Sequence, residues 1–310
     1  MKVAIVIVTY NAMQWIERCI TSILDSSIAL EIIIVDNKSQ DETVSFLRNK
    51  FSDKIILIES QENLGFGKGN NLGVSIALKQ GADYVFLQNQ DAFLQKNTLE
   101  KLVSIAEKNS KFGIISPIHL NGEGTNLEFY FAKYMEEELT PDFYFSHISQ
   151  KNLKEIYETD FVNAAAWLIP KNVLESVGGF DPIFWHYGED NNYAQRIKYH
   201  GYKIGIVRDS YILHDSKKRT FENYFYSERY YQDFVKFLQI KYADINKEVD
   251  FSKIKSEERN TLLFDSIMSI LKLDFKKIKV NLKKLRLLNS TLEFIKKSRK
   301  INISTGSHYL

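Results

Sequence analysis

Short apolar runs recur along the N-terminal part of the chain and are separated by segments with helical spacing. The runs contain valine, isoleucine and aromatic residues without polar alternation, which is typical of strands buried on both faces. Strands alternating with helices predict βαβ units and a mainly parallel sheet. The expected strands are 3–8, 32–35, 55–58, 84–87 and 113–116, and the expected helices include 13–24, a segment ending near 79, and 97–108.

Polar side chains follow four of these predicted strands, at the point where each strand ends. They lie at 9–11, 36–39, 63–70 and 89–91. Because ligands bind at the carboxyl ends of strands in open α/β sheets, we expect these segments to share one edge of the sheet. Asn11 is also a candidate cap for the helix that begins near Met13.

Two aspartates at these strand ends each have two interpretations. Asp91 either holds a hard divalent cation, which prefers oxygen ligands, or only caps the following turn. Asp36 either accepts a hydrogen bond from a nucleoside or forms a local turn with its own backbone. The residue pattern alone leaves both pairs of alternatives open.

The segment G-F-G-K-G-N-N, residues 65–71, has three alternating glycines ahead of a helix. Glycines there can let the backbone approach a phosphate. Its spacing matches neither the ATPase phosphate loop nor the dinucleotide-binding motif, and it follows the third strand rather than the first. Both of those classes are therefore excluded.

Composition is ordinary for a folded protein, with 44% apolar and 26% charged residues among 310. A formal net charge of +2 gives no indication of nucleic-acid binding. The single cysteine, Cys19, excludes an internal disulfide and fits a reducing compartment, so we expect a cytoplasmic location. The first apolar run ends without a cleavage site, and no window approaches a membrane-spanning length.

Six segments occur in one order along the chain: I-V-I-V-T-Y-N (5–11), I-I-V-D-N-K-S-Q-D (33–41), E-N-L-G-F-G-K-G-N-N-L-G (62–73), L-Q-N-Q-D-A (87–92), V-G-G-F-D (177–181) and G-E-D-N-N-Y-A-Q-R-I-K-Y-H-G-Y (188–202). Together they resemble the family 2 glycosyltransferases, particularly the rhamnosyltransferase-like members. The resemblance implies a GT-A fold in residues 1–215, with a nucleotide-sugar-binding half (1–112) and an acceptor-binding half (113–215). A helical C-terminal extension, 216–310, follows.

The resemblance also implies an activity: inverting transfer of a sugar from a nucleotide-diphosphate sugar, such as dTDP-rhamnose or a UDP-hexose. The acceptor is a hydroxyl of a saccharide or lipid-linked saccharide in bacterial surface polysaccharide synthesis. Asn89-Gln90-Asp91 takes the place of the family's D-x-D motif, with Asp91 and His214 binding Mg²⁺ or Mn²⁺. The implied nucleotide-sugar contacts are Thr9, Tyr10, Asn11, Asp36, Asn63, Gly65, Asn70, Asn89 and Gln90.

Asp190 is the general base that the resemblance implies, and Glu189 is expected to orient the acceptor or Asp190. A sugar hydroxyl becomes a good nucleophile only as its proton is removed, which a carboxylate within hydrogen-bond reach can do. Acidic residues at a helix start are also favoured by the helix dipole. Trp185 is expected near the sugar, because tryptophan favours positions that are partly buried and partly exposed to solvent. The strand 161–169 has small residues in its middle, which either leave room for the sugar or pack closely.

The chain after residue 221 is expected to be helical, with an aromatic face that includes Tyr224, Phe225 and Tyr231. Residues 269–300 contain eleven lysines and arginines and two acids, a net charge of 11 − 2 = +9. Three interpretations fit this basic amphipathic stretch: contact with the anionic inner face of the cell membrane, a solvated helical hairpin, or a homodimer contact.

Two other functions are alternatives to glycosyl transfer. A sugar-nucleotide pyrophosphorylase needs a Gly- and Arg-rich loop after the first strand, which residues 9–12 do not provide. A non-catalytic protein that binds nucleotide sugars or carbohydrates on the same fold is the alternative that remains. Residues 118–160 contain no motif that assigns a role.

Overall fold

The computed structural model describes residues 1–136, 138–216 and 227–310. Contacts divide the chain into two units, one formed by Met1–Lys217 with Thr305–Leu310 and the other by Lys218–Ser304. The C-terminal residues therefore belong to the first unit, although the segment before them belongs to the second.

The first half of the first unit is a run of βαβ units, as the apolar pattern predicted. Its strands pair in parallel in the order β3-β2-β1-β4. Thr9 pairs with Asp36 and Val8 with Asn89, so the strands end at the same level. The elements are β1 (Val3–Thr9), α1 (Ile16–Leu24), β2 (Leu30–Asp36), α2 (Thr43–Phe51), β3 (Ile56–Glu59), α3 (Gly65–Lys79) and β4 (Tyr84–Asn89).

The second half of the unit extends the sheet with mixed pairing. The order continues from β4 through β8, β6 and β9 to β5, and β7 pairs with β9. Strands β8 and β4 are antiparallel, whereas β6 and β9 are parallel. The elements are β5 (Ala92–Leu94), α4 (Thr98–Lys108), β6 (Phe112–Asn121), α5 (Phe129–Tyr134), α6 (Phe143–Ser149), β7 (Ile156–Thr159), β8 (Ala166–Pro170), α7 (Lys171–Val177), α8 (Glu189–Tyr199) and β9 (Lys203–His214).

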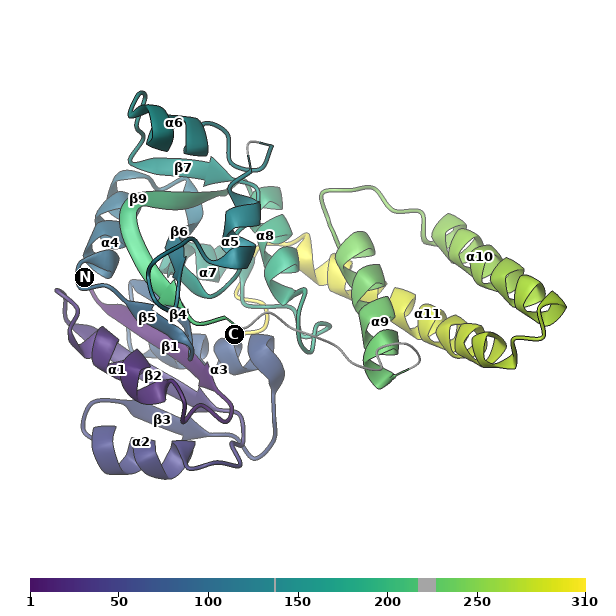
Figure 1. Cartoon of the computed structure of the whole chain (residues 1–310), viewed down its shortest axis with the longest axis horizontal. Coiled ribbons are helices and arrows are strands. Elements are labelled where there is room, and N and C mark those ends of the chain that lie inside the picture. The colour runs from purple at the N-terminus through teal and green to yellow at the C-terminus, as the bar shows by residue number, and fades with distance from the viewer. Residues whose placement is uncertain (137, 217–226) are drawn as a thin grey trace. The chain divides into compact units, whose positions relative to one another are not determined.

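Helices cover both faces of the sheet, which explains why the strands are apolar throughout (Figure 1). Along β1, Val3, Ile5 and Ile7 pack in one core with α1, α2 and α4. The alternate residues Ala4 and Val6 pack in the other core with α3, α7 and α8. Successive strand side chains point to opposite faces, so a strand between two helical layers needs apolar residues at every position.

Several predicted boundaries are wrong, for identifiable reasons. Helix α1 begins at Ile16, and Asn11 does not cap it: the Asn11 side chain accepts from the Gln40 N–H at 2.7 Å. The predicted strand 161–169 begins only at Ala166, because residues 161–163 have no regular structure and residues 164–165 form a turn. The strands β5 and β7 and the helices α5 and α6 were not predicted.

The second unit consists, in its described part, of the helices α9 (Glu228–Tyr242), α10 (Phe251–Leu271) and α11 (Phe275–Asn302). Ser227, Asp250 and Asp274 cap them, each accepting backbone N–H bonds of the first turn. The helical character of the tail is therefore confirmed for this part, while Tyr224 and Phe225 lie outside the described residues. Buried side chains hold the helices together, including Leu238, Leu262, Val280, Leu288, Leu292 and Ile295.

Among the described residues, no helix is both long enough and apolar enough to cross a bilayer.

Candidate active site

Asp36 lies at the carboxyl end of β2 and is almost fully buried. Its Oδ1 accepts from the Thr9 hydroxyl at 2.8 Å and from the Ser39 hydroxyl at 2.6 Å, and its Oδ2 accepts from the Ser39 N–H at 2.8 Å. The carboxylate thus ties the end of β1 to the turn after β2. These hydrogen bonds agree with the interpretation that Asp36 forms a local turn. Contact between Asp36 and a nucleoside stays a prediction.

The loop after β1 is fixed by side chains from two neighbouring strand ends. The Asn11 N–H donates to the Ser39 hydroxyl at 2.9 Å, with Asn11 at a φ of 49°. The Tyr10 N–H donates to Gln90 Oε1 at 2.8 Å, and Gln90 Nε2 donates to the Tyr10 carbonyl at 3.3 Å. Gln90 therefore positions this loop with its amide, while the Tyr10 side chain is 44% exposed and free to contact a ligand.

The segment before α3 is held against β2 and approaches a distant loop. The Asn37 amide donates to the Gly65 carbonyl at 3.0 Å, and Asn63 Oδ1 accepts from the Gly65 N–H at 2.9 Å. Gly65 has a φ of +75°, and a Cβ atom there would lie 2.2 Å from the Trp185 carbonyl oxygen. Only glycine fits both the backbone conformation and this close approach.

The other glycines of this motif let α3 pack tightly. A Cβ at Gly73 would lie 2.3 Å from the Val6 side chain of β1, and a Cβ at Gly69 would lie 3.0 Å from Val8. Asn70 is buried and its amide donates to the Phe66 carbonyl at 2.9 Å, within the helix. Helix–sheet packing accounts for Gly69 and Gly73, while contact of Asn70 with a nucleotide sugar stays a prediction.

Asp91 and His214 come together, as the metal hypothesis requires. His214 Nε2 lies 3.5 Å from Asp91 Oδ1, because β5 pairs His214 with Ala92 and the Asp215 N–H donates to the Asp91 carbonyl at 2.9 Å. His214 Nδ1 is buried without a hydrogen-bond partner in the described part of the chain. In residues 1–136, 138–216 and 227–310, no group of three or more His, Cys, Asp or Glu side chains is arranged to hold a metal. A cation at this pair would therefore need further ligands from a substrate.

Two buried polar residues beside His214 were missed in the sequence. His119 of β6 is fully buried, with its ring centroid 6.1 Å from that of His214, and burial lowers its pKa well below the usual value. Glu128 is also buried; it caps α5 by accepting from the Phe131 N–H at 2.7 Å and accepts from the Ser216 hydroxyl. Neither lies in a motif, and only the folded sheet brings them to this place.

Asp190 is the second residue of α8, and the helix follows Gly188, which has a φ of 95°. The residue is half-buried. Burial raises the pKa of Asp190, although backbone N–H groups, including those of Asn191 and Ala164, favour the ionised form. Burial also raises the pKa of Tyr134, and the nearby Asp190 and Glu128 carboxylates raise it further. Asp190 therefore lies in a protein-lined environment of the kind that tunes catalytic carboxylates.

One short segment connects Asp190 with the strand end that precedes Asp91. The Ala164 backbone interacts with the Asp190 carboxylate, and the next residue, Ala165, accepts from the Asn89 N–H at 3.0 Å. The two aspartates, which are far apart in sequence, thus lie on either side of the turn at 164–165.

Trp185 and Glu189 both lie against the start of α3. The Trp185 carbonyl faces Gly65, and a Cβ at Gly67 would lie 3.8 Å from the Glu189 Cβ. Trp185 is 57% exposed, so its indole is available to a ligand, whereas Glu189 is buried. The aromatic loop of the second half therefore contacts the nucleotide-sugar half that the sequence predicted.

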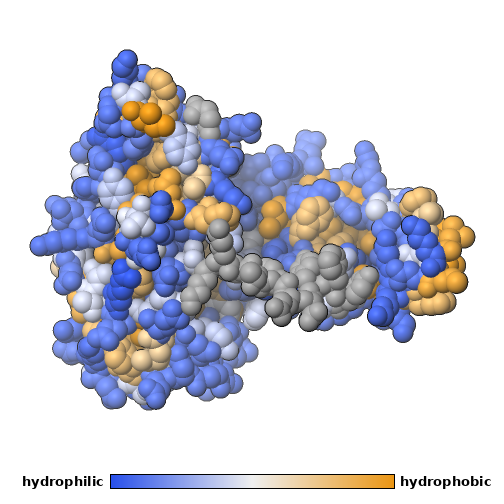
Figure 2. Space-filling model, in the orientation of Figure 1, coloured by the Kyte–Doolittle hydropathy of each residue, from blue (hydrophilic) through white to orange (hydrophobic). Residues whose placement is uncertain are grey.

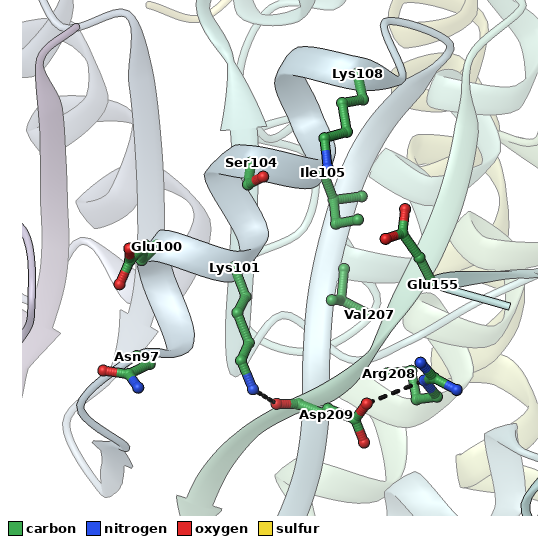
Figure 3. Close-up of a pocket in the computed structure, with 10 residues that line it drawn as sticks. All are labelled: Asn97, Glu100, Lys101, Ser104, Ile105, Lys108, Glu155, Val207, Arg208 and Asp209. Carbon is green, nitrogen blue, oxygen red and sulfur yellow. Dashed lines mark hydrogen bonds and ion pairs between the residues drawn. The ribbon is translucent and has the colours of Figure 1, made fainter. Parts of the chain in front are cut away.

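A cavity of about 460 Å³ lies elsewhere in the first unit, between α4 and β9 (Figure 3). Lys101 donates to the Asp209 carbonyl there, and Arg208 pairs with the Asp209 carboxylate at 3.0 Å. Arg208 precedes His214 by six residues of β9, roughly 20 Å along an extended strand. This cavity is separate from the strand-end site.

The sheet order of the first unit and its likeness to solved structures show the GT-A fold. The family model for glycosyl transferase family 2 matches residues 4–177, and the chain belongs to this family. The resemblance noted in the sequence is thereby confirmed.

Two curated relatives match much of the chain. The low-salt glycan biosynthesis hexosyltransferase Agl10 of Haloferax volcanii is 27% identical over 222 residues, covering 68% of this chain and 66% of its own length. The dTDP-rhamnosyl transferase RfbF of Shigella flexneri is 23% identical over 212 residues, covering 67% of each protein. The chain thus spans about two thirds of the length of these relatives.

Solved structures show the same fold at low identity. The S. aureus TarS 1–349 complex with UDP-GlcNAc has a TM-score of 0.56 and 15% identity, covering 98% of this chain and 89% of TarS. The Pyrobaculum calidifontis mannosyltransferase PcManGT, in complex with GDP-Man and Mn²⁺, has a TM-score of 0.55 and 17% identity, covering 96% of this chain and 73% of that protein. The predicted α/β GT-A fold is confirmed.

Proposed function

We propose that this protein transfers a sugar from a nucleotide-diphosphate sugar to an acceptor hydroxyl, with inversion at the anomeric carbon. The observation that supports this most is the turn at 164–165, which contacts both the strand end before Asp91 and the Asp190 carboxylate. A donor bound over this turn would have its diphosphate toward Asp91 and its sugar toward Asp190.

In this proposal Asp190 acts on the acceptor. Its ionised carboxylate takes the hydroxyl proton while the acceptor oxygen forms a bond with the anomeric carbon. The bond from that carbon to the diphosphate oxygen breaks, and the nucleoside diphosphate leaves with the electron pair. Attack from the face opposite the leaving group inverts the configuration. Glu189, buried beside Asp190, orients the acceptor or the base.

Asp91 and His214 fit a divalent cation such as Mn²⁺ or Mg²⁺. A carboxylate oxygen and an imidazole nitrogen converge at 3.5 Å, and such ions are commonly held by one or two protein groups and substrate phosphates. When bound, the cation would offset the charge that develops on the departing diphosphate. The Gln90 amide keeps the adjacent loop in place through the Tyr10 backbone.

The named relatives suggest the class of substrate. Agl10 is a hexosyltransferase of glycan biosynthesis and RfbF a dTDP-rhamnosyl transferase. We therefore propose a hexose or deoxyhexose donor, dTDP-rhamnose or a UDP-hexose, and a saccharide or lipid-linked saccharide acceptor in surface polysaccharide synthesis. TarS and PcManGT were solved with UDP-GlcNAc and with GDP-Man and Mn²⁺, which supports testing all three nucleotides.

A thermal-shift panel tests the donor site. The protein is heated with UDP-, dTDP- and GDP-sugars, each with and without Mn²⁺, since a ligand that binds only the folded state raises its stability. We expect one nucleotide class to raise the melting temperature, more with Mn²⁺, and Asp91→Ala to remove the metal-dependent part. Asp53→Ala, which removes an exposed carboxylate elsewhere, is the matched control. No shift with any donor would contradict the proposal, and binding without turnover would favour the non-catalytic alternative.

A further inference from the structure

Helix α10 carries an apolar face that the other described helices of the second unit do not cover. Phe264, Ile267, Met268 and Leu271 recur at helical spacing and are 63%, 57%, 37% and 73% exposed. The opposite face of the same helix is buried, at Leu262 and Ser269. A surface helix normally turns its apolar stripe inward, so this outward stripe needs another explanation.

The apolar surface continues around the turn into α11. Leu273 and Phe275 are 73% and 66% exposed, and Leu282 farther along is 50% exposed. Leu273 has a φ of +55°, a conformation that is unfavourable for leucine. We refer to residues 263–279 as the hairpin tip. Figure 2 shows hydrophobic surface gathered at this end of α10 and α11.

Four lysines surround this surface: Lys272, Lys276, Lys277 and Lys279, all exposed. None of them forms an ion pair with a described residue. Lys283, one turn farther along α11, pairs with Glu228 at 2.8 Å. With Asp265 and Asp274 as the acids of the hairpin tip, its net charge is 4 − 2 = +2.

We propose that the hairpin tip docks on an anionic lipid surface, with its apolar side chains among the acyl chains and its lysines on the headgroup phosphates. An exposed apolar patch ringed by unpaired lysines complements such a surface in both polarity and charge. A second copy of the chain fits less well, because a symmetric contact would bring the same four lysines of each copy together.

Vesicle flotation of the full-length protein tests the proposal. We expect the protein to bind vesicles of phosphatidylcholine mixed with phosphatidylglycerol and not vesicles of phosphatidylcholine alone. Each lysine near an anionic surface contributes about fivefold to the partition coefficient, so changing all four to glutamine reduces it by on the order of several hundred-fold. Phe264→Ser with Leu271→Ser also weakens binding. Phe294→Ser and Lys297→Gln, exposed on α11 outside the hairpin tip, are matched controls and bind normally.

Point changes are preferable to truncation, because Thr305–Leu310 belong to the first unit. A label at Leu273→Cys then separates insertion from simple adsorption. Cys19 is buried, and burial raises the pKa of its thiol to about 12, so a thiol-reactive fluorophore modifies only the new cysteine. Its emission shifts to the blue with anionic vesicles if the hairpin tip inserts. The proposal would be overturned by unchanged emission, or by equal binding of the lysine variant and the controls. It would also be overturned if light scattering showed a dimer that the apolar changes abolish.

Discussion

Replacing Gly65 by alanine tests the contact that joins the start of α3 to the Trp185 loop. The new Cβ would lie 2.2 Å from the Trp185 carbonyl oxygen, whereas ordinary contacts begin near 3.4 Å. One backbone must therefore move by about the difference, 3.4 − 2.2 = 1.2 Å. Both atoms belong to segments that line the candidate site, so the displacement should reach the donor.

The expected cost has two parts. A φ of +75° is unfavourable for alanine by about 1–2 kcal/mol, and forcing an extra carbon into a packed contact costs about 1–3 kcal/mol more. Gly81, after the other end of α3, has a φ of +83° with nothing within 4 Å of its Cβ position. Gly81→Ala therefore has only the first cost, that of the unfavourable backbone conformation. The two variants differ by the steric term, about 1–3 kcal/mol.

Tryptophan fluorescence is a suitable assay, because Trp15, Trp167 and Trp185 all belong to the first unit. Denaturant unfolding should show a larger loss for Gly65→Ala than for Gly81→Ala. The KM for the donor should rise in Gly65→Ala and remain unchanged in Gly81→Ala. Equal losses of stability and unchanged KM values in both variants would refute the proposed contact between residues 63–65 and the Trp185 loop.

Three further predictions follow from the site. Because burial raises the pKa of Asp190, the folded protein binds a proton at this carboxyl more tightly than the unfolded chain does. The stability that this proton binding provides is lost as the pH rises through the raised pKa. Asp190→Asn should therefore melt at a higher temperature than the wild type at neutral pH, and a lower melting temperature would contradict this expectation. The acid limb of the wild-type pH–rate profile should lie above the usual carboxyl range. Asp91→Asn and His214→Ala should each raise the Mn²⁺ concentration for half-maximal activity by at least about tenfold, the loss expected even from an outer-sphere partner; an unchanged titration would exclude the pair as ligands. Deleting Thr305–Leu310 removes two backbone hydrogen bonds, at Gly306 and Gly179, and should cost the first unit about 1–3 kcal/mol in tryptophan-monitored unfolding; unchanged unfolding would show that the tail does not stabilise it.

The βαβ half of the fold was predictable because its signals are local. Each strand lies between two helical layers and is apolar throughout, and each strand ends in polar residues that parallel pairing brings to one level. The pairing of Asp91 with His214 was also anticipated, although by resemblance rather than by spacing.

The remaining features depend on contacts between distant parts of the chain. The amide of Gln90 forms hydrogen bonds with the Tyr10 backbone. The buried Glu128 carboxylate accepts hydrogen bonds from the first turn of α5 and from Ser216. No local sequence pattern indicates these contacts. The helix α5 has only six residues and is held by the Glu128 cap, and no motif in residues 118–160 indicates it. The return of Thr305–Leu310 to the first unit is likewise a tertiary contact.

The central claim is that Asp190 removes the acceptor proton in a nucleotide-sugar-dependent transfer. The most direct test measures nucleoside diphosphate release with the donor that the thermal-shift panel selects, using saturating donor and a cell-derived saccharide extract as acceptor. Wild type and Asp190→Asn should bind the donor equally, while the variant releases product about 10²- to 10⁴-fold more slowly, the range expected for loss of a general base. Equal release rates at equal donor occupancy would contradict the assignment.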